Sequence, residues 1–302
     1  MRTLLLYLSH RPWLRNWMQN SHAASRFTRR FIAGRTLDHA LEACARLKSE
    51  NIAATLDRLG ENVTSLAEAE ASRDAYLNAL RGIAERRLGA TVSVKLTQLG
   101  LDISEPHCRE NVRMLAECAG QTGTRIEIDM ESSEYVERTL GIVTSQHTAT
   151  GNVRAVIQAY LHRSMEDVDM LCREKIPIRL CKGAYAEPHS VAIADKQGVD
   201  ANYSRLMRKL MADGVHPAFA THDEKMIREA IATARQRNLP PEAFEFQMLY
   251  GIRRDLQREL VREGFRLRIY VPFGDAWYPY FMRRLAERPA NVWFLLKNLL
   301  KS

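Results

Sequence analysis

The chain has 302 residues, of which 46% are hydrophobic and 26% are charged, a composition typical of a folded globular protein. This length suits either two domains or one α/β barrel of roughly 250 residues with an extra segment. Disordered, collagen-like and disulfide-dense proteins are excluded, and no apolar run approaches the roughly 18 residues that a membrane-spanning helix needs.

Seven of the eight net positive charges lie in the N-terminal segment. Seven arginines and no acidic residue precede Asp38, which leaves 37 of the 44 basic residues against 36 acidic ones in the remainder. We expect this segment to be either a solvated tail packed on the body or a segment that contacts the phosphates of a lipid surface or a nucleic acid. An Arg-rich, acid-poor start also resembles a mitochondrial transit peptide, whereas a secretory signal pattern is missing.

The five cysteines show no CxxC pair and no metal-ligand spacing. An odd number of widely spaced cysteines predicts reduced thiols in a reducing compartment. They are Cys44, Cys108, Cys118, Cys172 and Cys181.

Eight short apolar runs recur along the chain and alternate with longer amphipathic segments. The runs are rich in β-branched or aromatic residues, which is typical of buried strands. In chain order they are 52–56, 92–96, 125–130, 153–159, 177–181, 217–220, 244–249 and 267–271. The expected helices are 66–87, 105–119, 133–144, 164–174, 200–212, 225–237 and 253–262, with one more at 37–48 before the first run.

This alternation predicts an α/β fold, a (β/α)8 TIM-like barrel with an N-terminal helical arm. The arm covers residues 1–50 and the catalytic barrel residues 51–302. An open, doubly wound sheet is the alternative, but it usually carries a Gly-rich first turn, and no GxGxxG follows any run here.

Charged and polar side chains stand in or just after the eight runs, where a barrel places its chemistry. A structural ion pair such as Lys95 with Asp129 is one explanation, but several such residues at one rim favour a ligand site. Lys95 and Lys182 first suggest a Schiff-base aldolase. A metal is disfavoured because His222 has no HxH partner. The residues are Asp57, Lys95, Asp129, Glu131, Gln158, Arg179, Lys182, Thr221, His222, Asp223, Gln247 and Tyr270.

The segment after the last run carries two adjacent arginines, Arg283 and Arg284, in a predicted helix. Guanidinium groups bind carboxylates with paired hydrogen bonds. A basic rim without an obvious nucleophile indicates an anionic substrate and a bound cofactor that performs the chemistry.

At this point the sequence resembles the monofunctional bacterial proline dehydrogenases over nearly its whole length. Ala186 follows Tyr185 where bifunctional relatives carry Trp. Each matching block alone is weak, but all of them occur in order at the predicted strand ends. The blocks are LDRLGENV (56–63), SVKLTQLG (93–100), IDME (128–131), IQAYL (157–161), RLCKGAY (179–185), ATHD (220–223), FEFQMLYG (244–251) and RIYVPFG (268–274) through RRL (283–285).

The resemblance implies oxidation of L-proline to Δ1-pyrroline-5-carboxylate by hydride transfer to N5 of non-covalent FAD, with membrane quinone reoxidising the flavin. It implies a cytoplasmic protein peripheral to the inner face of the membrane, no nucleic-acid partner, and transient contact with a separate pyrroline-5-carboxylate dehydrogenase. The alternative is a barrel flavoenzyme acting on another secondary amine such as hydroxyproline.

The resemblance also assigns site residues. Lys95, Arg283 and Arg284 would hold the proline carboxylate, with Asp129 beside Lys95, and Glu61 would be a gate carboxylate that pairs with Arg283. The pyrrolidine ring would pack against Tyr185, Leu249 and Tyr270, and Tyr270 favours proline over hydroxyproline. The implied FAD contacts are Arg179 near flavin N5, with Gln158, Lys182, Gly183, Ala184, Lys196, Thr221, His222 and Glu287. Cys181 is expected to pack in place of a more usual Val.

Overall fold

The computed structural model describes residues 28, 30–60 and 63–287, with side chains described as far as residue 282. The N-terminal segment up to residue 27, the predicted gate residue Glu61 and the last 15 residues therefore lie outside the described residues. The arm boundary at residue 50 and the membrane role of the arm stay predictions.

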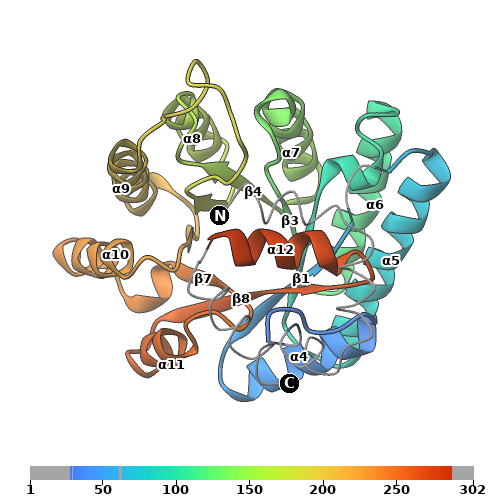
Figure 1. Ribbon diagram of the computed structural model, residues 1–302, viewed down its shortest axis with the longest axis horizontal. Helices are drawn as coiled ribbons and strands as arrows, with labels where there is room; N and C mark the ends of the chain where they lie inside the picture. Colours follow the sequence, from blue (N-terminus) through green and yellow to red (C-terminus); the bar gives the residue numbers. More distant parts are fainter. Residues whose placement is uncertain (1–27, 29, 61–62, 288–302) are drawn as a thin grey trace, which may run out of the picture.

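Eight parallel strands form a closed barrel in sequence order, and β8 pairs with β1 to complete it (Figure 1). Every predicted apolar run overlaps one strand, so the barrel prediction is confirmed and the open-sheet alternative is wrong. The strands are β1 (Ala53–Arg58), β2 (Thr91–Val94), β3 (Ile126–Ile128), β4 (Val153–Gln158), β5 (Ile178–Cys181), β6 (Ala218–Ala220), β7 (Glu245–Leu249) and β8 (Arg266–Phe273).

Helices follow the strands, and several begin at a side chain of the kind that caps and stabilises a helix start. Ser65, Ser104 and Asp223 each accept a hydrogen bond from the first turn of the helix that they precede. The α-helices are α4 (Leu37–Ser49), α5 (Leu66–Glu85), α6 (Glu105–Gln121), α7 (Val136–Thr150), α8 (Ser164–Arg173), α9 (Lys196–Asp213), α10 (Glu224–Gln236), α11 (Arg254–Arg262) and α12 (Trp277–Glu287). Short 3-10 helices lie at η1 (Leu96–Leu99), η2 (Ser133–Tyr135) and η3 (Pro241–Ala243).

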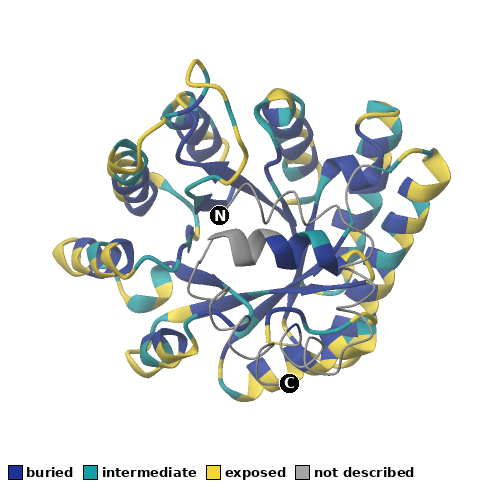
Figure 2. Cartoon of the chain, viewed as in Figure 1, coloured by how far each residue is buried: buried dark blue, intermediate teal, exposed yellow. Residues whose placement is uncertain are grey.

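Two helices lie outside the connections between strands, α4 before β1 and α12 after β8. α4 packs against β1 and β8 with its apolar side, and its buried residues join the main core. α12, which follows β8, lies across the middle of the barrel in Figure 1 and has a largely buried start in Figure 2. The predicted helix at 37–48 therefore closes the outer layer, while the last helix covers the candidate site.

A second, smaller hydrophobic cluster joins α12 to the chain just before α4. Phe31 and Ile32 are each 4% exposed, and the Phe31 ring meets the Phe281 ring edge-on at 6.1 Å. Two backbone hydrogen bonds of 3.0 Å tie this segment to the end of β8, from Ala33 N–H to the Pro272 carbonyl and from Gly274 N–H to the Gly34 carbonyl. These contacts hold the start of α12 over the barrel.

Among the described residues, no helix is long and apolar enough to cross a membrane. All five cysteines lie in the described part of the chain and none of them forms a disulfide there.

Candidate active site

The interior of the barrel is filled by charged side chains where such barrels usually carry branched apolar ones. At its lower level, Glu127 and Glu245 lie among Arg154 and Arg268. Arg154 contacts both carboxylates, and the Arg268 Nε atom donates to Glu245 Oε1 at 3.1 Å. Burial alone would raise the pKa of Glu127, but Arg179, Arg154 and Arg268 lower it to about 2. The buried charges therefore stabilise one another in pairs.

The upper level centres on Asp129, which follows β3. Asp129 Oδ1 accepts hydrogen bonds from Arg179 Nη1 and from the Ser93 hydroxyl, both at 2.8 Å. Asp129 Oδ2 accepts from the Tyr270 hydroxyl at 2.7 Å and from Lys95 Nζ at 3.4 Å. Three predicted site residues, Lys95, Arg179 and Tyr270, thus meet at the Asp129 carboxylate together with Ser93.

Lys95 lies between two carboxylates, because its Nζ atom also donates to Asp57 Oδ1 at 3.1 Å. Burial would lower the pKa of Lys95, but Asp57, Tyr270 and Asp129 raise it well above its ordinary value. Lys95 therefore keeps its positive charge. A lysine that forms a Schiff base needs a lowered pKa, so this geometry favours electrostatic binding by Lys95 over the aldolase chemistry.

The Arg179 side chain in β5 is held by Glu127 and by the Tyr270 ring. Its second guanidinium nitrogen contacts Glu127, and its central carbon lies 5.4 Å from the centre of the Tyr270 ring. The buried Nε atom of Arg179 and the buried Oε1 atom of Gln158 have no hydrogen-bond partner in the described part of the chain. A ligand with both an acceptor and a donor, such as a flavin ring, fits this pair of unused groups.

A cluster of two lysines and two aspartates lies beyond β5 and β6. Lys182 Nζ donates to Asp200 at 2.5 Å and to Asp223 at 2.8 Å, and Lys196 Nζ donates to Asp200 at 2.5 Å. Hydrogen bonds from both lysines lower the pKa of Asp200 against the opposing effect of its partial burial. Lys182 and Lys196, both predicted to contact FAD, thus lie close together, and each forms an ion pair with Asp200.

Gly183 follows β5 with φ +105°, a conformation that favours glycine. A Cβ atom there would lie 2.1 Å from the Tyr160 ring, so any larger residue would clash with that ring. Ala184 and Tyr185 come next and are exposed, with Tyr185 39% exposed.

His222 fixes the end of β7. Its Nε2 atom accepts a hydrogen bond from the Leu249 N–H at 2.9 Å, which orients Leu249 in its half-buried position. Thr221 Oγ1 accepts from the Asp223 N–H at 3.0 Å and so shapes the same turn. The Cys181 thiol, whose pKa burial raises to about 12, donates to the Ile157 carbonyl, consistent with a packing role.

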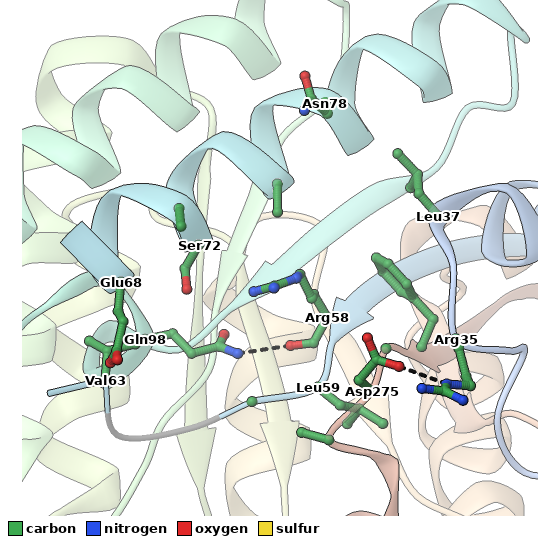
Figure 3. A pocket seen from close by; sticks show the side chains of 16 residues that line it. Arg35, Leu37, Arg58, Leu59, Val63, Glu68, Ser72, Asn78, Gln98 and Asp275 are labelled. Atoms are coloured by element: carbon green, nitrogen blue, oxygen red, sulfur yellow. Dashed lines mark hydrogen bonds and ion pairs between the residues drawn. The ribbon is translucent and has the colours of Figure 1, made fainter. Parts of the chain in front are cut away.

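The structure describes only part of the remaining predicted site. Arg283, Arg284 and Glu287 stand on α12, but their side chains are outside the described residues, as is Glu61. Gly60 and Val63, which flank Glu61, line a cavity of about 550 Å³ between α5 and the ends of β1 and β8. Figure 3 shows Arg58 in this cavity, with its carbonyl accepting from Gln98 and with Asp275 paired to Arg35 nearby.

The residues at the strand ends do not by themselves predict the lower level of charged side chains inside the barrel. Side chains two positions apart in a strand share a face, so Glu127 lies below Asp129, and Arg268 lies below Tyr270. That spacing could have revealed both residues. The described residues contain no cluster of three or more histidine, cysteine or carboxylate side chains that could hold a metal ion.

Comparisons with known proteins agree on one family. The model of the family described as proline dehydrogenase matches residues 40–297. The chain is 39% identical over 301 residues to proline dehydrogenase 1 of Bacillus subtilis subsp. natto, covering 100% of this chain and 99% of that protein. It is 38% identical over 282 residues to proline dehydrogenase of Deinococcus radiodurans, covering 90% and 89%.

The structural comparison gives the same result. The crystal structure of proline utilization A from Bdellovibrio bacteriovorus, inactivated by N-propargylglycine, has a TM-score of 0.81 and 27% identity to this chain. The similarity covers 87% of this chain and 32% of that larger protein.

Proposed function

Because the chain belongs to the proline dehydrogenase family, we propose that it oxidises L-proline to Δ1-pyrroline-5-carboxylate with bound FAD, and that membrane quinone is the final electron acceptor. The reaction removes a hydride from the ring carbon next to nitrogen and a proton from the nitrogen, and a C=N double bond forms. The observation that carries the proposal is the convergence of Lys95, Arg179 and Tyr270 on Asp129 at the strand ends of the barrel.

FAD, when bound, would supply the hydride acceptor at its N5 atom. Arg179 would place a permanent positive charge there, since Glu127 and Asp129 hold its guanidinium in place. A fixed cation stabilises negative charge that develops during reduction. Gln158, Lys182, Gly183, Ala184, Lys196, Thr221, His222 and Glu287 would make the other FAD contacts.

Lys95, Arg283 and Arg284 would bind the proline carboxylate, and Glu61 would close the site over Arg283. Lys95 suits this role because Asp57 and Asp129 keep it charged and hold its position. Tyr185, Leu249 and Tyr270 would pack the ring. Tyr270 is fixed by its bond to Asp129, and its bulk supports proline over hydroxyproline as the substrate.

The deciding experiment is anaerobic spectroscopy of the purified protein. We expect a flavin spectrum that bleaches when L-proline is added and that returns when a quinone analogue is supplied. Trans-4-hydroxyproline at the same concentration is the matched control and should bleach the flavin much more slowly. A protein without flavin, or one bleached equally by both compounds, would contradict the proposal. Covalent trapping by borohydride would instead indicate a Schiff-base lyase.

Arg284→Met is expected to leave FAD bound and to raise the KM for proline by roughly tenfold to a hundredfold, because one charged hydrogen-bond donor to the substrate carboxylate is lost. Steady-state kinetics with a soluble dye measure the change, and the ratio of 450 to 280 nm absorbance measures FAD content. Arg262→Met on the outer helix α11 is the matched control and should leave both values unchanged. An unaltered KM in Arg284→Met would remove that residue from the proposed site.

The basic arm would bring the enzyme to the cytoplasmic face of the membrane, where the quinone lies. We expect deletion of residues 1–20 to weaken cosedimentation with vesicles containing anionic lipid and to spare dye reduction, because attraction to such a surface scales with the number of basic residues. Neutral vesicles are the control. Undiminished binding after deletion would assign the arm a structural role. After oxidation, the product would pass to a separate pyrroline-5-carboxylate dehydrogenase by transient contact.

A further inference from the structure

The loop between β5 and α9, drawn beside α8 in Figure 1, is attached to the barrel in two separate places. Its second half is held to the turn after β4. There the His162 N–H donates to the Val191 carbonyl at 3.0 Å, and the Ile193 N–H donates to the Tyr160 carbonyl at 2.7 Å. These backbone bonds fix the loop from Val191 onward, and just before it the His189 carbonyl lies 3.0 Å from His162 Nε2.

In the first half of the loop, the Lys182 carbonyl accepts from the Tyr160 N–H at 2.9 Å, and the Glu187 side chain forms two further hydrogen bonds. Its Oε1 atom accepts a hydrogen bond from the Ser133 N–H at 2.7 Å, and its Oε2 atom accepts one from the Ser133 hydroxyl at 2.5 Å. Ser133 begins η2 in the connection after β3, so this contact passes over β4 and joins two non-adjacent connections at the mouth of the barrel. Both residues are half-buried.

The residues between Gly183 and Glu187 are restrained at both ends. Gly183 packs against the Tyr160 ring, which leaves no room for a Cβ atom. Glu187, four residues later, is anchored to Ser133. Tyr185 lies midway between these two anchors, and it is 39% exposed at the mouth of the barrel. Its location therefore depends on both anchors.

We propose that Glu187 is a positioning residue, which sets the place of Tyr185 by anchoring the loop to Ser133. This rests on the proposed function, in which Tyr185 packs against the substrate ring. An ionised carboxylate makes stronger hydrogen bonds than a neutral acceptor, so two bonds to Ser133 suit a loop that must be held firmly. Glu187 itself touches neither the proline nor the flavin in this arrangement.

The first test compares Glu187→Ala with wild type. The KM for proline should rise about tenfold, which corresponds to one lost charged hydrogen bond, while kcat changes by less than about threefold and FAD content stays constant. Ser133→Ala, which keeps the backbone donor, should give a smaller rise, and Ser133→Thr should retain the wild-type KM. Glu166→Ala, an exposed carboxylate on α8, is the matched control and should change nothing.

The second test asks whether Glu187 acts through Tyr185. In a Tyr185→Ala background, Glu187→Ala should add little to the KM, because the side chain that it positions is already gone. Fully additive effects, or an unchanged KM in Glu187→Ala alone, would overturn the proposal.

Hydrogen exchange of the peptide spanning residues 183–188 provides a readout that is independent of catalysis. Exchange should accelerate in Glu187→Ala and should not change in Glu166→Ala; equal exchange in both would also overturn the anchor. If wild-type flavin is not bleached by proline, the proposed function fails, whereas the exchange result still decides whether Glu187 fixes the loop.

Discussion

Replacing Arg179 with methionine is expected to slow reduction of the bound flavin by proline roughly a hundredfold to a thousandfold, the usual loss when one preorganised donor to developing charge is removed. Arg179 is the buried cation at the end of β5, held by Asp129 at 2.8 Å and stacked on Tyr270. Stopped-flow absorbance under anaerobic conditions measures the rate directly. Burial would lower the pKa of Arg179, but the charges of Glu127 and Asp129 raise it above its ordinary value, so the cation persists at any working pH.

Arg179→Lys serves as the matched variant for this experiment. It keeps the charge but loses the forked geometry that contacts Glu127, Ser93 and Asp129 together. Its rate should therefore fall between those of wild type and Arg179→Met. Thermal unfolding and flavin content should be measured in parallel, because the substitution leaves the carboxylates of Glu127 and Asp129 each short of one partner. A reduction rate within tenfold of wild type in a flavin-loaded Arg179→Met protein would contradict the assigned role.

The second large effect is expected in stability. Glu127→Gln should lower the free energy of unfolding at pH 7 by about 3–5 kcal/mol, because it leaves the buried guanidinium groups of Arg154, Arg179 and Arg268 with one carboxylate fewer. Urea denaturation followed by circular dichroism measures this loss. Glu166→Gln, on the exposed surface of α8, is the control and should be neutral.

The same residue predicts how stability depends on pH. The pKa of Glu127 is lowered to about 2 from its ordinary value of 4.5, so its stabilising effect is complete above pH 4.5. That stabilisation is lost as the pH falls from about 4.5 toward 2, where the carboxylate is protonated. The difference in unfolding free energy between wild type and Glu127→Gln should therefore shrink over this interval. A difference that stays constant down to pH 2.5 would refute the ionised state of Glu127.

The sequence predicts the barrel well because each strand is a short run of β-branched and aromatic residues separated from the next by a helix-length segment. It predicts part of the site for a related reason: in a closed parallel barrel all strand ends meet at one rim, so Lys95, Asp129, Arg179 and Tyr270 can be grouped without coordinates. Their mutual distances agree with that grouping.

Pairing partners are harder to predict, because charge and spacing along a chain do not select among several candidates. Lys182 finds Asp200 and Asp223, which are 18 and 41 positions away in sequence, and nothing in the pattern distinguishes them from neighbouring acids. Glu187 and Ser133 are 54 positions apart and lie in connections without periodicity. The sequence also does not predict that α4 packs against β1 and β8, because a helix before the first strand can pack on any open face of the barrel.

The closure of the barrel between β1 and β8 has a consequence for biosynthesis. The Arg268 side chain donates to the Ala54 carbonyl, 214 positions earlier in the chain, and six residue pairs join these two strands. A ribosome that adds 5–20 residues per second needs about ten seconds or more to deliver β8 after β1 has emerged. Until then β1 has an open edge, and Asp129 lacks the hydroxyl of Tyr270. The pocket around Asp129 is thus completed last, and cofactor capture belongs to the finished chain and not to a nascent fragment.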